Sequence, residues 1–332
     1  MRRRTILHSA AAAMALAALP GALAQVRPPR IYMILYRGET GVERGFRDYF
    51  TLNRIPVEFI IRNVDFDAGK VPALITEARE LKADLVYTYG TAVTMAVAGK
   101  EGSADPVRNI TNIPIVFTMV AAPQACGIVK SLASSRRNVT GVSHVVPVRQ
   151  QMNAIRAYRR FERIAALYNP AEPNAVVNMR EWRALAAQEH FQLIEKPVPL
   201  DEQGKPVAEA LPGIVEELAQ QADLLYLGPD SFLMAHRKQL TEVALAQRLP
   251  TFSAVEAGLR EGRALFGLVS GYENLGRLAA HKAVQILRHR VKPAALPIET
   301  LPRFSYLVNM SVAEELKLYP PAKVLQYAEQ IR

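Results

Sequence analysis

Two acidic residues stand where apolar strands give way to helices, and their positions suit chemistry or ligand binding. Glu172 lies in Tyr168–Asn174, directly after an expected strand, and Asp230 follows a second expected strand through the turn Gly228-Pro229. Two such carboxyl groups could act as a general acid and base, or could hold an ammonium or hydroxyl group of a bound solute. As N-terminal caps of helices they would need no ligand at all. The sequence leaves these interpretations open.

A third polar turn has the opposite charge preference. Gly90-Thr91 ends one strand and opens a helix, so its free N–H groups and hydroxyl suit an anion such as a ligand carboxylate. The segment Ala83–Thr91 resembles Ala222–Ser231, because each contains a short apolar strand, a glycine turn and a polar helix start. The near repeat predicts two similar lobes whose polar turns face each other across a cleft.

The elements that must position these turns alternate between strand and helix at lengths typical of parallel βαβ units. The sequence therefore predicts an α/β fold with two doubly wound lobes. The expected strands are residues 30–36, 56–61, 84–88, 113–119, 137–143, 163–168, 191–197, 224–228, 251–253, 264–268 and 306–308. The expected helices include residues 91–98, 148–158, 174–190, 232–248, 272–289 and a last helix, 311–318, capped by Ser311.

The first 24 residues are predicted to be a secretory signal peptide. They combine Arg2-Arg3-Arg4, an apolar run from Ala10 to Leu19 and the small-residue pattern Ala22-Leu23-Ala24. The run is too short to span a membrane. An ordinary secretory route and a twin-arginine route both stay open. The single cysteine, Cys126, lies inside the mature chain, so we expect an exported, soluble protein without a lipid anchor.

Several other classes of site are excluded by composition and spacing. The net charge of +10 is spread among acids and not gathered in a stripe, which favours a solvated surface over nucleic-acid binding. The glycines of Gly38–Gly45 lack dinucleotide-binding spacing, and no P-loop or nucleophile elbow occurs. No histidine pairs with a cysteine or carboxylate at metal-ligand spacing. His144, at the predicted lobe boundary, is interpreted as either a ligand contact or an exposed hinge residue, and Cys126 as a partly buried apolar residue.

Motifs along nearly the whole mature chain resemble one family, the periplasmic substrate-binding proteins of ABC transporters, in the branch associated with tryptophan and other aromatic amino acids. Asn138-Val139-Thr140-Gly141 followed by Asn169-Pro170-Ala171-Glu172-Pro173-Asn174 is the most specific match. The remaining matches are Tyr89–Ala92, Ile113–Phe117, Gly127–Ala133, Tyr272 and Leu275–Arg277.

This resemblance implies a type I periplasmic binding fold in which two Rossmann-like lobes, joined by a three-segment hinge, close over a solute. The implied boundaries are residues 25–143 plus 271–298 for lobe one and 144–270 plus 299–332 for lobe two. The implied partners are a small-molecule ligand and a membrane permease, with no cofactor, and the protein is expected to be a monomer. The candidate ligand-binding residues are Gly90, Thr91, Ala92, Asn138, Asn169, Glu172, Asn174, Asp230, Ser231 and Tyr272.

The chain departs from the family pattern at three acidic positions, where it has Ala121-Ala122-Pro123, His144 and Gly271. A ligand ammonium group would therefore have fewer partners. An aromatic or heterocyclic acid and a neutral polar solute are as compatible with the sequence as an amino acid. The alternatives to transport are a ligand sensor that feeds a signalling partner and an enzyme that uses Glu172 and Asp230.

Overall fold

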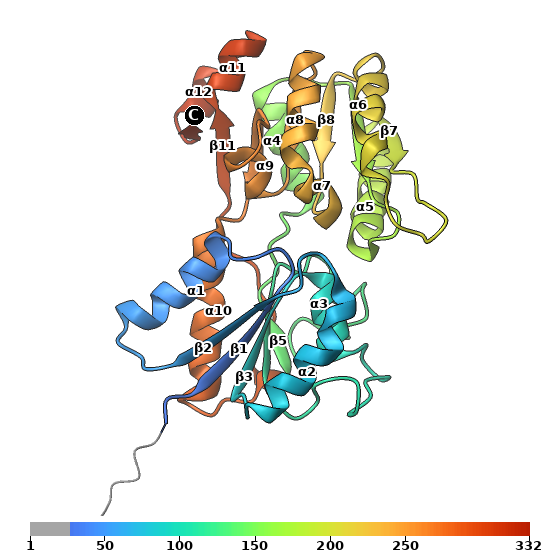
Figure 1. Cartoon of the computed structure of the whole chain (residues 1–332). Helices are drawn as coiled ribbons and strands as arrows, with labels where there is room; N and C mark the ends of the chain where they lie inside the picture. Colours follow the sequence, from blue (N-terminus) through green and yellow to red (C-terminus); the bar gives the residue numbers. More distant parts are fainter. Residues whose placement is uncertain (1–26) are drawn as a thin grey trace, which may run out of the picture.

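The computed structural model describes residues 27–332, so the predicted signal peptide lies outside the described residues. Two α/β lobes lie one above the other, with the amino-terminal sheet in one and the carboxyl terminus in the other (Figure 1). Each lobe has its own sheet with helices on both faces. The predicted fold class, with two doubly wound lobes, is confirmed.

The first lobe contains a five-stranded parallel sheet in the order β2-β1-β3-β4-β5. Its strands are β1 (Arg30–Leu35), β2 (Glu58–Asn63), β3 (Leu85–Tyr89), β4 (Ile115–Thr118) and β5 (Val139–Gly141). Its helices are α1 (Gly41–Leu52), α2 (Val71–Glu80), α3 (Thr91–Ala98), α10 (Tyr272–Leu287) and the short turns η1 (Ala68–Lys70) and η3 (Pro293–Ala295).

Alternating side chains of β1 determine which helices cover each face of this sheet, because successive strand residues point to opposite faces. Met33 and its neighbours at every second position pack with Phe46 of α1 and Leu275 of α10. Tyr32 and Ile34 face the other way, toward α2 and α3. Burial on both faces is typical of a parallel sheet, and it leaves the carboxyl edge of the strands as the place for polar loops.

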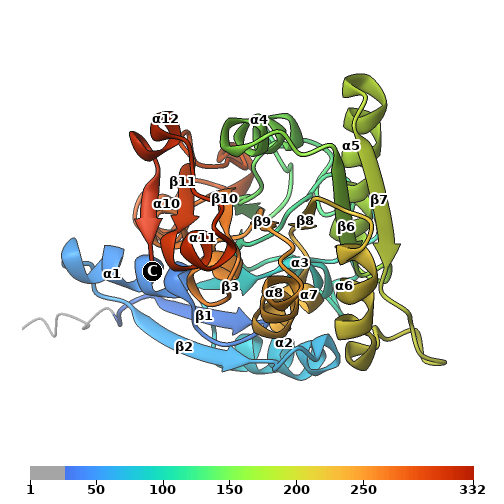
Figure 2. The same ribbon diagram turned by 90° about the horizontal axis from the view of Figure 1, so that it is seen from above.

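The second lobe contains a seven-stranded sheet in the order β12-β11-β10-β9-β8-β6-β7. The pair β10 and β11 is antiparallel and the other pairs are parallel, so β11 and β12 run opposite to the remaining strands. Its strands are β6 (Arg163–Tyr168), β7 (Gln192–Pro197), β8 (Leu224–Leu227), β9 (Thr251–Ser253), β10 (Phe266–Val269), β11 (Ser305–Asn309) and β12 (Glu329–Ile331). Its helices are α4 (Val148–Tyr158), α5 (Pro173–Glu189), η2 (Ala208–Ala210), α6 (Leu211–Ala219), α7 (Ser231–Ala235), α8 (Arg237–Ala246), α9 (Glu256–Arg260), α11 (Met310–Leu316) and α12 (Ala322–Leu325). The helices α4 and α5 cover one face, and α6 and α8 cover the other (Figure 2).

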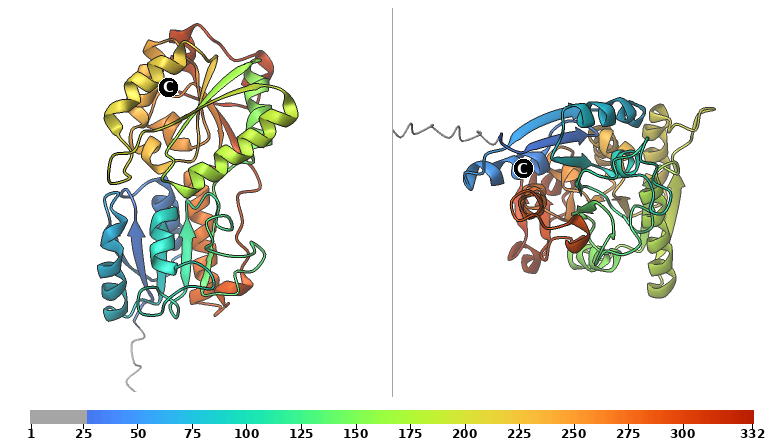
Figure 3. Two further views of the ribbon diagram at one scale, coloured as in Figure 1. Left: turned by 90° about the vertical axis from the view of Figure 1, so that its right-hand side faces the viewer. Right: turned by 90° about the horizontal axis from the view of Figure 1, so that it is seen from below.

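Three segments of the chain cross between the lobes (Figure 3). The first follows β5, the second joins β10 to α10, and the third leads from α10 to β11. The first and third lie side by side, since the Ser143 N–H donates to the Glu299 carbonyl at 2.8 Å. The buried Lys282 fastens the third segment to α10 through hydrogen bonds to the Pro297 carbonyl (2.7 Å) and the Glu299 carboxylate (2.5 Å).

Two sequence predictions about helices are wrong. The expected helix 232–248 is divided into α7 and α8 at His236. The Arg237 guanidinium donates a hydrogen bond to the Met234 carbonyl (2.6 Å), which satisfies that acceptor near the end of α7. The helix expected at residues 311–318 is α11, which begins at Met310 and is capped by Asn309 and not by Ser311. The Asn309 Oδ1 accepts hydrogen bonds from both the Val312 N–H (3.2 Å) and the Ser311 hydroxyl (2.9 Å). The short elements α9, α12 and β12 were not predicted.

Glycine permits the close contact between α1 and α10. A methyl group on Gly276 would overlap the Val42 carbonyl oxygen and lie 2.6 Å from the Phe46 nitrogen. Because both obstacles are backbone, we expect Gly276→Ala to lower the free energy of unfolding by about 3 kcal/mol. Gly213→Ala is the matched control, since it is exposed on α6 with nothing within 4 Å. It should raise stability by about 0.8 kcal/mol. Urea denaturation measures both, and equal stabilities for the two variants would contradict this account of the helix contact.

Candidate functional site

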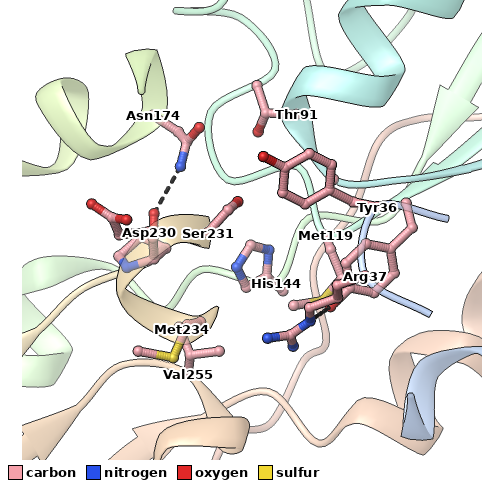
Figure 4. Close-up of a pocket in the computed structure, with 13 residues that line it drawn as sticks. Tyr36, Arg37, Thr91, Met119, His144, Asn174, Asp230, Ser231, Met234 and Val255 are labelled. Atoms are coloured by element: carbon pink, nitrogen blue, oxygen red, sulfur yellow. Dashed lines mark hydrogen bonds between the residues drawn. The ribbon is translucent and has the colours of Figure 1, made fainter. Parts of the chain in front are cut away.

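A cavity lies between the two lobes, where carboxyl ends of strands from both sheets converge (Figure 4). Its volume is about 40 Å³. That is room for one or two water molecules, far below the roughly 300–1,000 Å³ of ordinary small-molecule pockets. A groove of about 360 Å³ adjoins it and shares Asn174 and Pro229 with it. The residues that line the cavity are Tyr36, Arg37, Tyr89, Gly90, Thr91, Met119, His144, Asn174, Pro229, Asp230, Ser231, Met234 and Val255.

The second-lobe wall is built around Asp230, which is almost fully buried. One of its oxygens accepts the Leu233 N–H at 2.9 Å and caps α7, and the other accepts the Asn169 N–H at 2.6 Å. These two bonds fix the turn after β8 against the turn after β6. Burial, and then the nearby Glu172 carboxylate, raise the pKa of Asp230.

Glu172 is a second, partly buried acid beside this wall, and its oxygens are also held by the protein. One oxygen accepts the Ser231 hydroxyl (2.8 Å) and the Asn174 amide (2.9 Å), and the other accepts the Ser231 N–H (2.8 Å). Burial raises the pKa of Glu172, although these hydrogen bonds oppose the shift. The Asn174 Nδ2 also donates to the Pro229 carbonyl at 2.7 Å, while its buried Oδ1 has no partner among the described residues.

The first-lobe wall carries a cation held by tyrosines. Arg37 follows β1, and its Nε donates to the Tyr89 hydroxyl (3.1 Å) and its Nη2 to the Tyr272 hydroxyl (3.3 Å). The guanidinium also lies over the Tyr89 ring, 5.7 Å from its centroid. Tyr36 faces the acids of the other lobe: burial raises its pKa first, and then Glu172 and Asp230 raise it further.

His144 lies between these two walls in the first crossover segment (Figure 4). It is buried, so the exposed-hinge interpretation is wrong. Burial, and secondarily the charge of Arg37, lower its pKa from 6.5 to about 4. The imidazole is therefore neutral at pH 7, and its buried Nδ1 has no hydrogen-bond partner within residues 27–332.

The depressed pKa of His144 predicts a measurable pH dependence. The unfolded chain takes up a proton below pH 6.5, whereas the folded chain resists it until about pH 4, so stability is lost as the pH falls through that interval. The loss is about 1.4 kcal/mol per pH unit, or about 3 kcal/mol in all. We expect the stability advantage of the wild type over His144→Gln to shrink by that amount between about pH 7 and about pH 4 in urea denaturation. Comparing the two proteins cancels the titration of Asp230 and Glu172, and a constant difference would contradict the assignment.

Half of the predicted site residues line the cavity, three more lie directly behind its walls, and two lie away from it. Gly90, Thr91, Asn174, Asp230 and Ser231 line it. Asn169 and Glu172 lie directly behind the second-lobe wall, and Tyr272 supports Arg37 from behind the other. The two predicted residues that lie away from the cavity are Ala92 and Asn138.

These two exceptions have physical reasons. Ala92 is exposed, one position beyond the turn that faces the cavity. Asn138 precedes β5, at the opposite edge of the sheet from the cavity, and its amide donates to the carbonyls of Ile110 (3.0 Å) and Ile113 (2.6 Å). It therefore joins the loop before β5 to the loop before β4 at the amino edge of the sheet.

Sequence analysis missed several cavity residues. Tyr36 and Arg37 were available from one signal, because they lie at the carboxyl end of an expected strand, as Gly90 and Asp230 do. The others carry little signal, since hydrophobic residues at strand ends are common. These residues are Tyr89, Met119, Pro229, Met234 and Val255.

Other candidate chemistry can be tested against the described part of the chain. Within residues 27–332, no three histidine, cysteine, aspartate or glutamate side chains are grouped to hold a metal ion. Cys126 is buried, and burial raises the pKa of its thiol to about 11, so it carries no thiolate at neutral pH. No helix in these residues is long and apolar enough to cross a membrane.

Comparison with known proteins identifies the family. Residues 39–332 match the family described as ABC transporter substrate binding protein. The chain belongs to this family. A tyrosine-binding protein from Clostridioides difficile (strain R20291) is 23% identical over 278 residues, covering 83% of this chain and 74% of that protein. The members of the family are substrate-binding proteins and not enzymes, which removes the enzyme alternative for Glu172 and Asp230.

Solved structures of similar proteins have the same fold. A domain from Streptococcus pneumonia in complex with L-Trp superposes with a TM-score of 0.80 at 21% identity, covering 92% of this chain and 100% of that one. A ligand-free, open substrate-binding protein with adhesive properties from Clostridium difficile gives a TM-score of 0.69 at 20% identity, covering 92% and 99%.

Proposed function

We propose that this protein is an exported receptor that captures a small polar or aromatic solute between its lobes and delivers it to an ABC transporter permease. The observation that carries the proposal is the cavity itself. Its lining comes from the carboxyl ends of strands in both sheets. One wall carries the Arg37 cation, the other has the buried Asp230 with the partly buried Glu172 behind it, and two polar atoms of the lining have no partner within residues 27–332. The tyrosine and tryptophan ligands of the relatives support an amino acid or a related aromatic solute.

The same geometry supports a division of the chain into two lobes. We assign residues 25–143 and 271–298 to lobe one, and residues 144–270 and 299–332 to lobe two. The contact of α10 with α1 supports the return of the chain at residue 271. The pairing of Ser143 with Glu299 places the first and third crossovers together.

Capture requires the lobes to move apart, because a cavity of about 40 Å³ cannot admit a solute of amino-acid size. A solute shifts the balance toward the closed form only by the contacts it makes better there. A solute that touches Tyr36 or Arg37 on one lobe and Asn174 or Ser231 on the other makes such contacts. A permease would then distinguish the loaded protein by its closed shape.

Native mass spectrometry tests the proposal even while the solute is unidentified. The protein is expressed with its own leader, purified from the exported fraction without refolding, and sprayed under native and denaturing conditions. We expect a one-to-one complex with a small molecule that is released chemically unchanged on denaturation. Conversion of the molecule, or failure to bind any member of a broad amino-acid and organic-acid library in a thermal-shift assay, would contradict the proposal.

A further inference from the structure

Arg37 is a cation at the cavity that forms no ion pair within the described part of the chain. Its hydrogen bonds go to the neutral hydroxyls of Tyr89 and Tyr272, and no carboxylate among the described residues forms an ion pair with it. Burial opposes its protonated form, but the two tyrosines and the more distant Glu261 raise the pKa of Arg37 overall. The Glu261 carboxylate is itself paired with Arg237. The Arg37 Nη1 donates to no acceptor in residues 27–332, although the residue lines the cavity. An arginine that is largely withdrawn from water normally pairs with a carboxylate or phosphate, because an uncompensated charge is costly to desolvate.

The acids nearest the cavity are not available to Arg37. Both oxygens of Asp230 accept backbone N–H groups, from Leu233 and Asn169. Both oxygens of Glu172 are bound by Ser231, and one also by Asn174. These carboxyl groups are committed to the architecture of the second lobe, whereas the arginine on the first lobe keeps a free donor.

Two further polar atoms at the same cavity lack partners. The His144 Nδ1 and the Asn174 Oδ1 are buried and make no hydrogen bond within the described chain. Both residues line the cavity with Arg37. Buried polar atoms are almost always satisfied in folded proteins. Their presence beside a guanidinium that forms no ion pair among residues 27–332 is an independent indication that a polar molecule belongs there.

We propose that Arg37 binds a carboxylate of the solute, and that the transported class is therefore small organic acids, amino acids included, and not amines or uncharged polar compounds. This inference rests on the proposed function of the cleft. A guanidinium presents parallel N–H donors that match the two oxygens of a carboxylate. Tyr89 and Tyr272 fix its plane from behind. A carboxylate bound there would compensate the charge of the first lobe while the rest of the solute reaches Asn174 and Ser231 of the second.

The experiment compares solutes that differ only in charge. Binding to the wild type is measured by isothermal titration calorimetry for the molecule identified by mass spectrometry. The same is done for L-tryptophan and L-tyrosine, their deaminated acids indole-3-propionate and 4-hydroxyphenylpropionate, and their decarboxylated amines tryptamine and tyramine. We expect every solute that binds to carry a carboxylate, and the amines to fail.

Variants then assign the effect to one side chain. Arg37→Gln should weaken binding of each carboxylate solute by about 100-fold, and Arg37→Lys, which keeps the charge without the planar fork, by about tenfold. Arg44→Gln is the matched control, because Arg44 is exposed on α1 and pairs only with Glu273. It should bind as the wild type does. Circular dichroism checks folding, and if Arg37→Gln does not fold, the amines on the wild type together with Arg37→Lys decide the question.

The outcomes separate this inference from the proposed function. Tight binding of an amine or an uncharged solute, or unchanged affinity in a folded Arg37→Gln variant, overturns the assignment of the carboxylate to Arg37 and leaves the receptor function intact. Absence of binding by every solute, with nothing retained after native purification, overturns both.

Discussion

Asp230→Ala should lower the free energy of unfolding by about 3 kcal/mol and weaken solute binding by at least about tenfold. The stability loss is expected because the change leaves two buried backbone N–H groups, those of Leu233 and Asn169, without acceptors. The binding loss is expected because these bonds fix the turns after β6 and β8 in register, and Asn174 and Ser231 belong to the same wall. Urea denaturation and calorimetry measure the two effects.

Asn309→Ala is the control for this prediction. Asn309 caps α11 in the same lobe, but it is the last residue of the antiparallel strand β11 and does not line the cavity. Its loss should lower stability by about 1 kcal/mol without changing affinity. Asp230→Asn keeps one oxygen acceptor but replaces the other oxygen with an amide nitrogen, so it should fall between the wild type and Asp230→Ala in stability. Wild-type stability and affinity in Asp230→Ala would show that the second-lobe wall has been misassigned.

Glu43→Ala should also be strongly destabilising, by about 3–4 kcal/mol. Glu43 is fully buried in the first lobe, where its carboxyl group accepts the Thr40 N–H (2.8 Å), the Thr40 hydroxyl (2.7 Å) and the Tyr87 hydroxyl. Tyr87 in turn contacts the Thr118 hydroxyl at 2.7 Å. The network joins the start of α1 to β3 and β4, two strands whose ends form the cavity wall.

The neighbouring acid Glu39 separates this effect from a general loss of charge. Glu39 is half-exposed and pairs with Arg47 at 2.8 Å, so Glu39→Ala should change stability by less than about 1 kcal/mol. Burial raises the pKa of Glu43. The folded protein therefore holds this proton at a higher pH than the unfolded chain, and the wild type should gain stability relative to Glu43→Gln as the pH falls toward 4.5. Equal losses for Glu39→Ala and Glu43→Ala would contradict the role of the network.

The sequence predicted those site residues whose position follows from local rules. Gly90-Thr91 and Asp230-Ser231 each follow an apolar strand and open a helix, and the carboxyl edge of a parallel sheet gathers such turns. Asn174 was found for the same reason. Asn138 belonged to an equally specific motif, but it precedes its strand, and this places it at the wrong edge of the sheet.

The same rule marks Arg37 as a strand-end residue, but it does not show why Arg37 matters. An arginine after a strand is ordinary, and its significance depends on the absence of a carboxylate in three dimensions. Its partners Tyr89 and Tyr272 lie 52 and 235 residues away in the sequence. The division of the expected helix 232–248 at His236 was not predicted for a related reason. It is accompanied by a hydrogen bond from the Arg237 side chain to the Met234 carbonyl and not by a helix-breaking residue.

A crystal structure of the protein purified with its retained solute tests the central claim most directly. The account predicts the solute between the lobes, with its carboxylate on the Arg37 guanidinium and its remaining polar groups on His144, Asn174 or Ser231. It further predicts that the molecule in the crystal is chemically identical to the solute that native mass spectrometry identifies. A solute bound on the outer surface of one lobe, or a chemically altered molecule in the cleft, would contradict the account.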